Sequence, residues 1–329
     1  MRKKIRPYFY LLNGLLEYSK TGTTTENAYQ ALINVFCRTG GRVNRILNYF
    51  ITKARNPYTV QGESKIIENA EISKAIKHLK KDGYYIFNNK ISPELCENLT
   101  EFAKKAPTVA HPSEGSKLSL YSEKTSKTET MRVPESELLK NNNIRSWICD
   151  PGLVRLAQLY LGPQPRIDHV GMWWSVARSG DPSKEGAQEY HFDLDRIRFI
   201  QIFVYLTDCN TNDGPHCFVR GTHRPSKQTS VLLKRGYARI PDFDIQKAFS
   251  QDDIIEILGS KGTVFAVDTT AFHKGKKPEN KDRLVLQTVY CSSLFGANKP
   301  KTGVFLRGND NLSGFYKKHP PFMKRYQEA

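Results

Sequence analysis

The sequence lacks a long apolar run, and none of its cysteines form a close pair. No stretch of roughly 18 consecutive apolar residues occurs in the 329-residue chain, which argues against a membrane-spanning helix. Its six cysteines are too sparse for a disulfide scaffold, and none belongs to a Cys-x-x-Cys pair of the kind found in zinc ribbons and thioredoxin-type sites. We therefore expect reduced thiols in a cytoplasmic protein.

The composition is that of a folded chain rather than a disordered one. Hydrophobic residues make up 39% of the chain and aromatic residues 11%, which excludes global disorder and a low-complexity repeat protein. The length suggests about two domains, or one large domain with attachments. Such a chain buries a sizeable core without disulfides or structural metals.

Acidic residues are scarce at both ends of the chain. The formal net charge is +17, of which residues 1–60 carry +8 and residues 296–329 carry +5. Basic ends favour contact with an anionic partner, such as nucleic acid, membrane headgroups or an acidic polymer. A solvated basic surface that only keeps the protein soluble explains the same charge equally well.

Residues 1–60 are predicted to form a basic helical N-terminal extension. Met1–Leu16 places basic residues ahead of a short, interrupted apolar stretch without a small-x-small cleavage site, which argues against a signal peptide. We interpret it as a short amphipathic helix that docks on the protein or lies on a membrane surface. A helical pattern over residues 24–52 follows, with a break at Gly40-Gly41.

The middle of the chain predicts helices first and strands later. The expected helices are Glu63–Lys81, one that begins at Ser92-Pro93-Glu94 and runs to Lys105, Asn143–Leu161, and one within residues 242–258. The polar residues 107–143 are expected to form a mobile loop or lid. The expected strands are Tyr84–Phe87, Ile167–Ala177, Arg198–Thr207, Gly262–Val267 and Arg283–Cys291, with a weaker one at Gln228–Leu233. This order fits a sheet sandwich or barrel flanked by helices.

The most informative segment contains His191 and Asp193. If it is extended, both side chains point to the same face and reach one metal ion. The best third ligand is His273, just after a predicted strand, although His169, His216 and His223 remain alternatives. Two histidines and one carboxylate on one face of a metal leave three positions open, as in non-haem Fe(II) oxygenases. The spacing alone also fits a surface histidine and aspartate beside a turn.

A second feature supports the oxygenase interpretation. Arg283 follows His273 by ten residues and opens a predicted strand. A planar guanidinium suits bidentate capture of a carboxylate. An arginine near the distal ligand could hold the far carboxylate of a 2-oxo diacid whose other end chelates the metal, whereas taken in isolation it would more simply form a surface salt bridge.

Taken in order along residues 65–295, these motifs resemble the phytanoyl-CoA dioxygenase family of Fe(II)/2-oxoglutarate-dependent oxygenases. The resemblance is carried by Lys80–Ile86 with Ile91–Glu94, by His191-Phe192-Asp193, by Thr207–Arg224, and by Phe272–Gln287. It implies a mainly β fold with flanking helices, a double-stranded β-helix (jelly-roll or cupin-like) core, and the helical N-terminal extension. The domains expected are the extension (1–60), the oxygenase domain (61–295) and a basic C-terminal tail (296–329).

The resemblance also implies roles for individual residues. His191, Asp193 and His273 would be the metal ligands and catalytic centre, Arg283 would bind 2-oxoglutarate, and Phe203 would lie near this co-substrate. The cofactors implied are Fe(II), 2-oxoglutarate and O2. One departure is Gly275, where the family often has a serine that bonds the co-substrate.

The expected activity is hydroxylation of an unactivated C–H bond in a small-molecule, lipid-type or saccharide-type acceptor, with succinate and CO2 as co-products. Asp193 favours hydroxylation over halogenation, because the halogenating relatives of this family carry a small residue in place of the metal-binding carboxylate. Candidate pocket residues are Trp173, Arg178 and Tyr190. The competing hypotheses are a basic protein that binds nucleic acid or an anionic surface, such as a membrane, on the same scaffold without turnover, and a non-catalytic interaction module.

Overall fold

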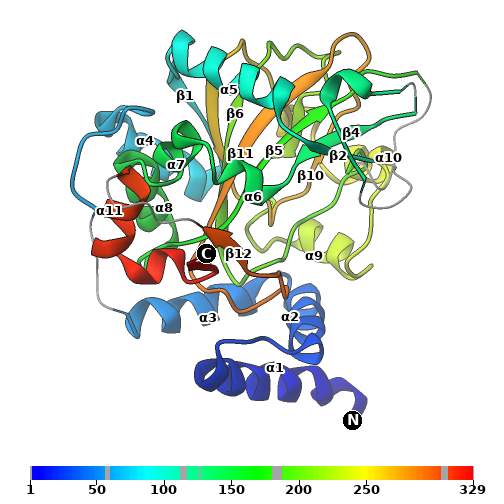
Figure 1. Cartoon of the computed structure of the whole chain (residues 1–329). Helices are drawn as coiled ribbons and strands as arrows, with labels where there is room; N and C mark the ends of the chain where they lie inside the picture. Colours follow the sequence, from blue (N-terminus) through cyan, green and yellow to red (C-terminus); the bar gives the residue numbers. More distant parts are fainter. Residues whose placement is uncertain are drawn as a thin grey trace.

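A computed structural model describes residues 2–55, 60–111, 117–125, 127–179, 187–304 and 310–328. Its centre is a large antiparallel sheet of eight strands with a smaller sheet of three strands (Figure 1). The large sheet has the order β1 (Tyr84–Lys90), β9 (Thr263–Val267), β6 (Phe199–Tyr205), β11 (Arg283–Cys291), β5 (Arg166–Ser175), β4 (Thr130–Val133), β2 (Thr108–His111) and β3 (Leu118–Ser119). The small sheet has the order β10 (His273–Gly275), β7 (His216–Val219) and β8 (Ile254–Ile257), also antiparallel.

Helices surround these sheets and form the two ends of the chain. The α-helices are α1 (Arg2–Thr21), α2 (Glu26–Thr39), α3 (Arg42–Lys53), α4 (Asn69–Lys81), α5 (Pro93–Lys105), α6 (Glu135–Leu138), α7 (Asn142–Ile148), α8 (Pro151–Leu161), α9 (Lys227–Leu233), α10 (Asp242–Ala248) and α11 (Asn311–Lys318). Short 3-10 helices cover Tyr121–Glu123, Gln251–Asp253 and Pro320–Met323. Two parallel strands, β12 (Thr302–Val304) and β13 (Tyr326–Glu328), pair near the C-terminus.

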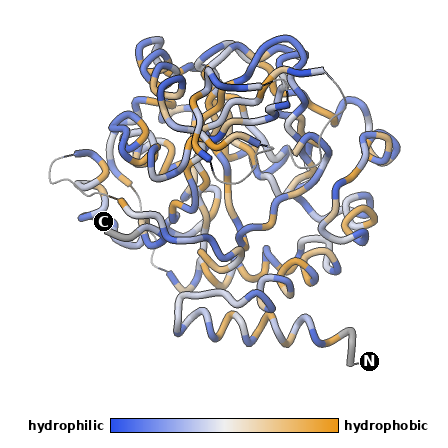
Figure 2. The backbone as a smooth tube through the Cα atoms, turned by 45° about the vertical axis from the view of Figure 1, so that its right-hand side comes forward, coloured by the Kyte–Doolittle hydropathy of each residue, from blue (hydrophilic) through white to orange (hydrophobic). Residues whose placement is uncertain are grey.

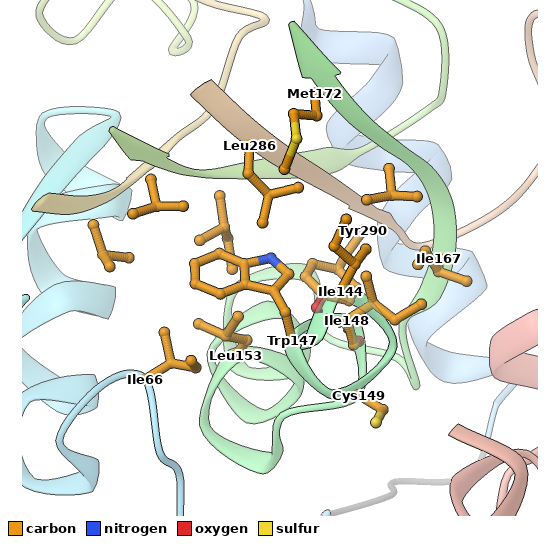
Figure 3. Packing of buried hydrophobic residues seen from close by; sticks show 14 of the residues in the cluster. Ile66, Ile144, Trp147, Ile148, Cys149, Leu153, Ile167, Met172, Leu286 and Tyr290 are labelled. Atoms are coloured by element: carbon orange, nitrogen blue, oxygen red, sulfur yellow. Dashed lines mark hydrogen bonds between the residues drawn. The ribbon is translucent and has the colours of Figure 1, made fainter. Parts of the chain in front are cut away.

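The central strand β11 separates the helix-covered core from the inside of the sandwich. Leu284, Leu286 and Tyr290 alternate along one face, as side chains in a strand must. They pack around Trp147 of α7, which is 1% exposed (Figure 3). The indole N–H of Trp147 donates to Thr288 Oγ1 at 2.9 Å, so its polar atom is satisfied within the core. The opposite face of β11 is thereby left to line the interior between the sheets.

The observed architecture confirms the expected class, a mainly β core with flanking helices and an N-terminal group of helices. The strands expected at 167–177, 198–207, 262–267 and 283–291 correspond to β5, β6, β9 and β11. Their runs of β-branched and aromatic residues are buried on both faces, which explains why they were visible in the sequence.

Two predicted helices have different limits in the structure. The helix expected from Glu63 begins at Asn69, and Ile66 and Ile67 are instead buried in the core ahead of it. The helix expected over Asn143–Leu161 is divided in two at Asp150-Pro151. The Asp150 carboxylate accepts hydrogen bonds from the N–H groups of Gly152 and Leu153, and Pro151 occupies the first turn of α8.

Two other predictions were wrong. The polar region 107–143 is not simply a loop, because β2 and β4 extend the large sheet; residues 112–116 and 126 lie outside the described residues. Gln228–Leu233 belongs to helix α9, whose start is capped by Ser226. The helix expected within 242–258 is confirmed as α10, and it is followed by a 3-10 turn and strand β8.

Helices α1, α2 and α3 lie together at one end of the molecule, and α1 lies across that end (Figure 2). The first of them is longer than expected and reaches Thr21. Gly14 permits close packing of α1 on α2, because a Cβ there would lie 2.2 Å from the Cβ of Ala28. None of the helices among the described residues combines the length and the apolar character needed to cross a bilayer.

Candidate functional site

The predicted metal ligands meet at one edge of the small sheet. His191 and His273 exchange backbone hydrogen bonds, with N···O distances of 2.9 and 2.8 Å, so the segment around His191 is paired with β10. The N–H of Asp193 donates to the carbonyl of Thr269 at 2.7 Å. These bonds hold the His191–Asp193 segment against the loop that leads into His273.

The three side chains converge to metal-binding distances. One ligand atom from each of His191, Asp193 and His273 lies within 4.8 Å of the other two. The Nε2 atom of His191 is 3.7 Å from Asp193 Oδ1, and the Nε2 atom of His273 is 3.5 Å from Asp193 Oδ2. Two imidazoles and one carboxylate on one side of a point form the donor set that suits non-haem iron.

Hydrogen bonds behind the ligands fix their orientation. The Nδ1 atoms of His191 and His273 lie 2.9 and 3.0 Å from the carbonyl oxygens of Glu189 and Ala271. An Nδ1–H that donates to these carbonyls leaves Nε2 with its lone pair directed at the common centre. The Nε2–H of Gln201 donates to Asp193 Oδ2 at 3.0 Å, and Gln287 donates in turn to Gln201 at 2.6 Å.

The electrostatics favour the protonation states that bind a cation. Burial, with the neighbouring His273, lowers the pKa of His191 and therefore favours a neutral imidazole. Burial alone would raise the pKa of Asp193, but His273 and His191 lower it below its ordinary value. A metal ion requires neutral imidazole and ionised carboxylate, so the donor set matches a divalent metal in charge as well as geometry.

The three candidate ligands line a cavity of about 210 Å³. Arg283, the residue predicted to bind the co-substrate, lines the same cavity. Arg283 is 6% exposed, and its Nη2 donates to the Ser175 hydroxyl at 3.0 Å across the β11–β5 pair. Three buried atoms of residues that line this cavity have no hydrogen-bond partner within the described part of the chain: Arg283 Nε, Thr130 Oγ1 and His216 Nε2. Because buried polar groups are normally paired, these atoms fit a ligand with carboxylate oxygens.

Aromatic side chains form part of the cavity wall. Phe203 stacks on Phe265 with ring centroids 5.0 Å apart and lies edge-on to Trp173 at 6.3 Å. The ring of His216 stacks on that of His273 at 5.3 Å. Burial, then the charges of His273 and Arg283, holds the pKa of His216 well below its usual range, so this ring is neutral.

The residues suggested for the substrate pocket lie in different places. Trp173 lines the cavity, whereas Tyr190 and Arg178 are not among the residues that line it. Tyr190 is 3% exposed and packs in a separate hydrophobic cluster, and Arg178 pairs with Glu129 at 2.8 Å. Asp195, two residues after Asp193, pairs with Lys299 at 2.7 Å.

Several cavity residues were not identified from the sequence. Gln201, Ser175, Thr130 and Arg132 line the cavity from three different strands. His216, one of the alternative third ligands, also lines it but is not among the three converging ligands. Strand alternation shows which residues share a face, but not which strands become neighbours. The only available signal was the position of Ser175 and Gln201 within strongly predicted strands.

Comparison with known proteins supports the fold. The structure is similar to the crystal structure of EctD from S. alaskensis with bound Fe, with a TM-score of 0.50 and 16% identity over 74% of this chain and 85% of that chain. It is less similar to the epimerase SnoN in complex with Fe3+, alpha-ketoglutarate and nogalamycin RO (TM-score 0.49, 16% identity, 68% and 84% covered). HygX from Streptomyces hygroscopicus, with nickel and 2-oxoglutarate bound, gives 0.44 at 16% identity (69% and 89% covered). A search of curated proteins gives no match.

The family comparison covers most of the sandwich and both motif regions. Residues 79–283 match the phytanoyl-CoA dioxygenase family (PhyH), and this segment contains the His-x-Asp motif, His273 and Arg283. The resemblance and the double-stranded β-helix core expected from the sequence are therefore confirmed. The chain belongs to the phytanoyl-CoA dioxygenase family and is a dioxygenase that depends on iron and 2-oxoglutarate.

Proposed function

We propose that this dioxygenase hydroxylates an unactivated C–H bond of a small-molecule acceptor, with His191, Asp193 and His273 as the iron ligands. The observation that carries the proposal is that these three donors share one cavity with the Arg283 guanidinium. The balanced reaction converts acceptor, 2-oxoglutarate and O2 into hydroxylated acceptor, succinate and CO2. The bound Fe(II) supplies the activation of O2 that is coupled to decarboxylation of 2-oxoglutarate.

The protein's own groups position the reactants. His191, Asp193 and His273 would hold the iron with three donor atoms, so that coordination positions would remain for co-substrate and O2. Arg283, assisted by the hydroxyls of Ser175 and Thr130, receives the far carboxylate of 2-oxoglutarate. These two hydroxyls compensate for Gly275, which carries no side chain at the position where the family often has a serine. Phe203 and Phe265 exclude water from the part of the cavity that they line.

The acceptor that fits this cavity carries a negative charge. Arg132 lies at the cavity mouth with its guanidinium carbon 5.4 Å from the centre of the Trp173 ring. Among the described residues, no carboxylate pairs with Arg132. An unpaired guanidinium held on an aromatic face favours a carboxylate or phosphate, as carried by anionic lipids and acidic saccharides.

An anaerobic titration tests the iron and co-substrate site. Metal-free protein is titrated with Fe(II) and 2-oxoglutarate, and the visible charge-transfer band of the chelated complex is recorded. The band is expected in the wild type, lost in Asp193→Ala, and shifted to at least tenfold higher 2-oxoglutarate concentration in Arg283→Ala. Asp195→Ala is the matched control, because its carboxylate pairs with Lys299 instead. A folded wild type without the band would contradict the proposal.

A second experiment tests the charge of the acceptor and the outcome of the reaction. Matched pairs of carboxylic acids and their amides are compared as stimulators of 2-oxoglutarate turnover. The acid of each active pair is expected to act at lower concentration, and Arg132→Gln to reduce that preference at least tenfold. Mass spectrometry of the product should show one added oxygen atom. Equal stimulation by acids and amides would exclude Arg132 as the recognition group, and a product without added oxygen would exclude hydroxylation.

A further inference from the structure

Helix α3 has an unusual distribution of side chains for a surface helix. Its buried positions include two asparagines, Asn44 and Asn48, whose side-chain amides donate to the carbonyls of Ile197 and Leu161 at 2.7 and 2.8 Å. Its outer face instead exposes large hydrophobic residues. Ile46, Tyr49 and Phe50 are 57%, 58% and 63% exposed. Val43, Leu47 and Ile51 pack inward against the neighbouring hydrophobic cluster, so α3 carries apolar side chains on its inner face and a second apolar group on its outer face, which a surface helix normally keeps polar.

Helix α1 carries a second exposed apolar stripe. Its inner side packs on α2, while five large hydrophobic residues, each between 46% and 59% exposed, lie outside: Ile5, Tyr8, Phe9, Leu12 and Leu16. Their spacing of three and four residues places them in one row along the helix. Of the fifteen large hydrophobic residues that are exposed among the described residues, eight lie on α1 and α3. Such a concentration on two helices at the same end of the molecule marks an interaction site.

The charge around these stripes identifies the kind of partner. Residues 1–55 contain ten lysines and arginines and only two acids, Glu17 and Glu26. In α3 the exposed face consists of the three hydrophobic residues with Arg42, Arg45 and Lys53, and the helix contains no acidic residue. A partner must therefore combine an apolar layer with negative charge, as the headgroup region of an anionic bilayer does.

We propose that the N-terminal face binds the surface of an anionic membrane. This face consists of the exposed hydrophobic residues of α1 and α3 together with Arg42, Arg45 and Lys53. Tyrosine and phenylalanine insert at the level of the headgroups, while the basic side chains contact lipid phosphates. A second copy of the chain fits this face less well, because self-pairing would bring two basic surfaces together. The attachment is peripheral, since no described helix is able to cross the bilayer.

Vesicle sedimentation with the full chain tests this proposal without iron, 2-oxoglutarate or acceptor. Vesicles of neutral phosphatidylcholine are compared with vesicles in which about a quarter of the lipid is phosphatidylglycerol. Binding is expected only to the anionic vesicles and is expected to weaken with salt. The double variants Tyr49→Ser/Phe50→Ser and Arg42→Glu/Arg45→Glu should each bind at least tenfold more weakly. Circular dichroism checks that each variant remains folded.

The control removes an exposed aromatic residue elsewhere. Phe243 of α10 is 71% exposed but lies between Asp242 and Asp244, so Phe243→Ser should bind anionic vesicles like the wild type. A folded wild type that ignores anionic vesicles would overturn the proposal. An equal loss of vesicle binding in Phe243→Ser would also overturn it. Tighter binding to duplex DNA than to the vesicles would identify nucleic acid as the partner instead. A wild-type dimer that becomes a monomer in Tyr49→Ser/Phe50→Ser would identify a second copy of the chain as the partner.

Discussion

Gln201 links the carboxylate of the candidate iron site to the large sheet. It lies in β6, donates from Nε2 to Asp193 Oδ2 at 3.0 Å, and accepts from Gln287 of β11 at 2.6 Å. Two strands thus determine the position of one carboxylate oxygen. Hydrogen bonds of this kind to metal-binding side chains orient the ligand and tune its basicity. Gln201 is a positioning residue in this scheme.

Replacement of Gln201 by leucine is expected to weaken Fe(II) binding about tenfold or more, because Asp193 loses its orienting donor. Equilibrium binding of Fe(II) under anaerobic conditions measures the effect. Gln287→Leu removes only the outer hydrogen bond and should weaken binding less. If both variants bind Fe(II) like the wild type while remaining folded, the amide pair has no positioning role.

The sequence identified the candidate ligands but not the residues around them. His191 and Asp193 are two residues apart, so local alternation was enough to place them on one face. Gln201, Ser175 and Thr130 join the cavity only through the pairing of β6, β5 and β4 with their neighbours. That order of strands is decided by packing over the whole sheet, which no short motif contains.

At the scale of elements, α7 is fixed to the sheet by one large side chain. Trp147 is 1% exposed and packs between the helices and β11 (Figure 3). Trp147→Ala should lower the free energy of unfolding by about 4 kcal/mol, because it leaves a large cavity. Denaturant unfolding measures the change. Leu159→Ala on the adjacent α8 is the control, since Leu159 is 51% exposed and should change stability by less than about 1 kcal/mol.

A second link between elements depends on pH. Glu135 of α6 accepts hydrogen bonds from Arg325 at 3.0 and 2.7 Å and from the Tyr326 hydroxyl at 2.7 Å. Burial alone would raise the pKa of Glu135, but hydrogen bonds from His169 and Arg325 hold it well below its usual range. Because the folded pKa is the lower one, this carboxylate stabilises the fold above its ordinary pKa near about 4.3. The contribution is lost as the pH falls below that value.

Glu135→Gln should therefore destabilise the protein by about 3 kcal/mol at neutral pH, where it leaves Arg325 buried without its counter-charge. The difference from the wild type should shrink as the pH falls below about 5, because the Glu135 carboxyl of the unfolded wild-type chain then takes up a proton while the folded one stays ionised. Urea unfolding across this range provides the measurement. Glu137→Gln on the same helix is the control, because Glu137 pairs with Lys140 near the surface. A constant difference at every pH would contradict this explanation.

The accuracy of the element predictions followed the strength of each local signal. The long apolar strands and the helix start at Ser92-Pro93 were found because the residues within each segment are enough to specify its structure. The short strands β7 and β10 were missed, because three or four residues give no measurable period. Gln228–Leu233 contains Thr229 and Val231, which favour strands, but the Ser226 cap and the burial of Leu232 and Leu233 select a helix.

At the scale of the whole molecule, the C-terminal region packs against the oxygenase core. Leu312, Phe322 and Met323 are at most 2% exposed and belong to the same hydrophobic cluster as Trp147. Phe322 lies 6.0 Å from the ring of Tyr290 in the central strand β11. The division at residue 295 between an oxygenase domain and a basic tail remains a prediction. Because the C-terminal region packs on the core, removing it tests that division through a change in stability.

Deletion of residues 310–329 should lower the free energy of unfolding by at least about 4 kcal/mol, because each buried apolar side chain contributes about 1.5–3 kcal/mol. That loss is a large fraction of the total stability of a typical domain, so the deleted chain should melt well below the wild type. If the deleted chain fails to fold, Phe322→Ala tests the same contact, and this variant should lower the free energy of unfolding by about 3 kcal/mol. Unchanged melting of the deleted chain would instead establish residues 310–329 as a separate tail, and the buried positions of Leu312 and Phe322 would then contribute nothing to the stability of the oxygenase core.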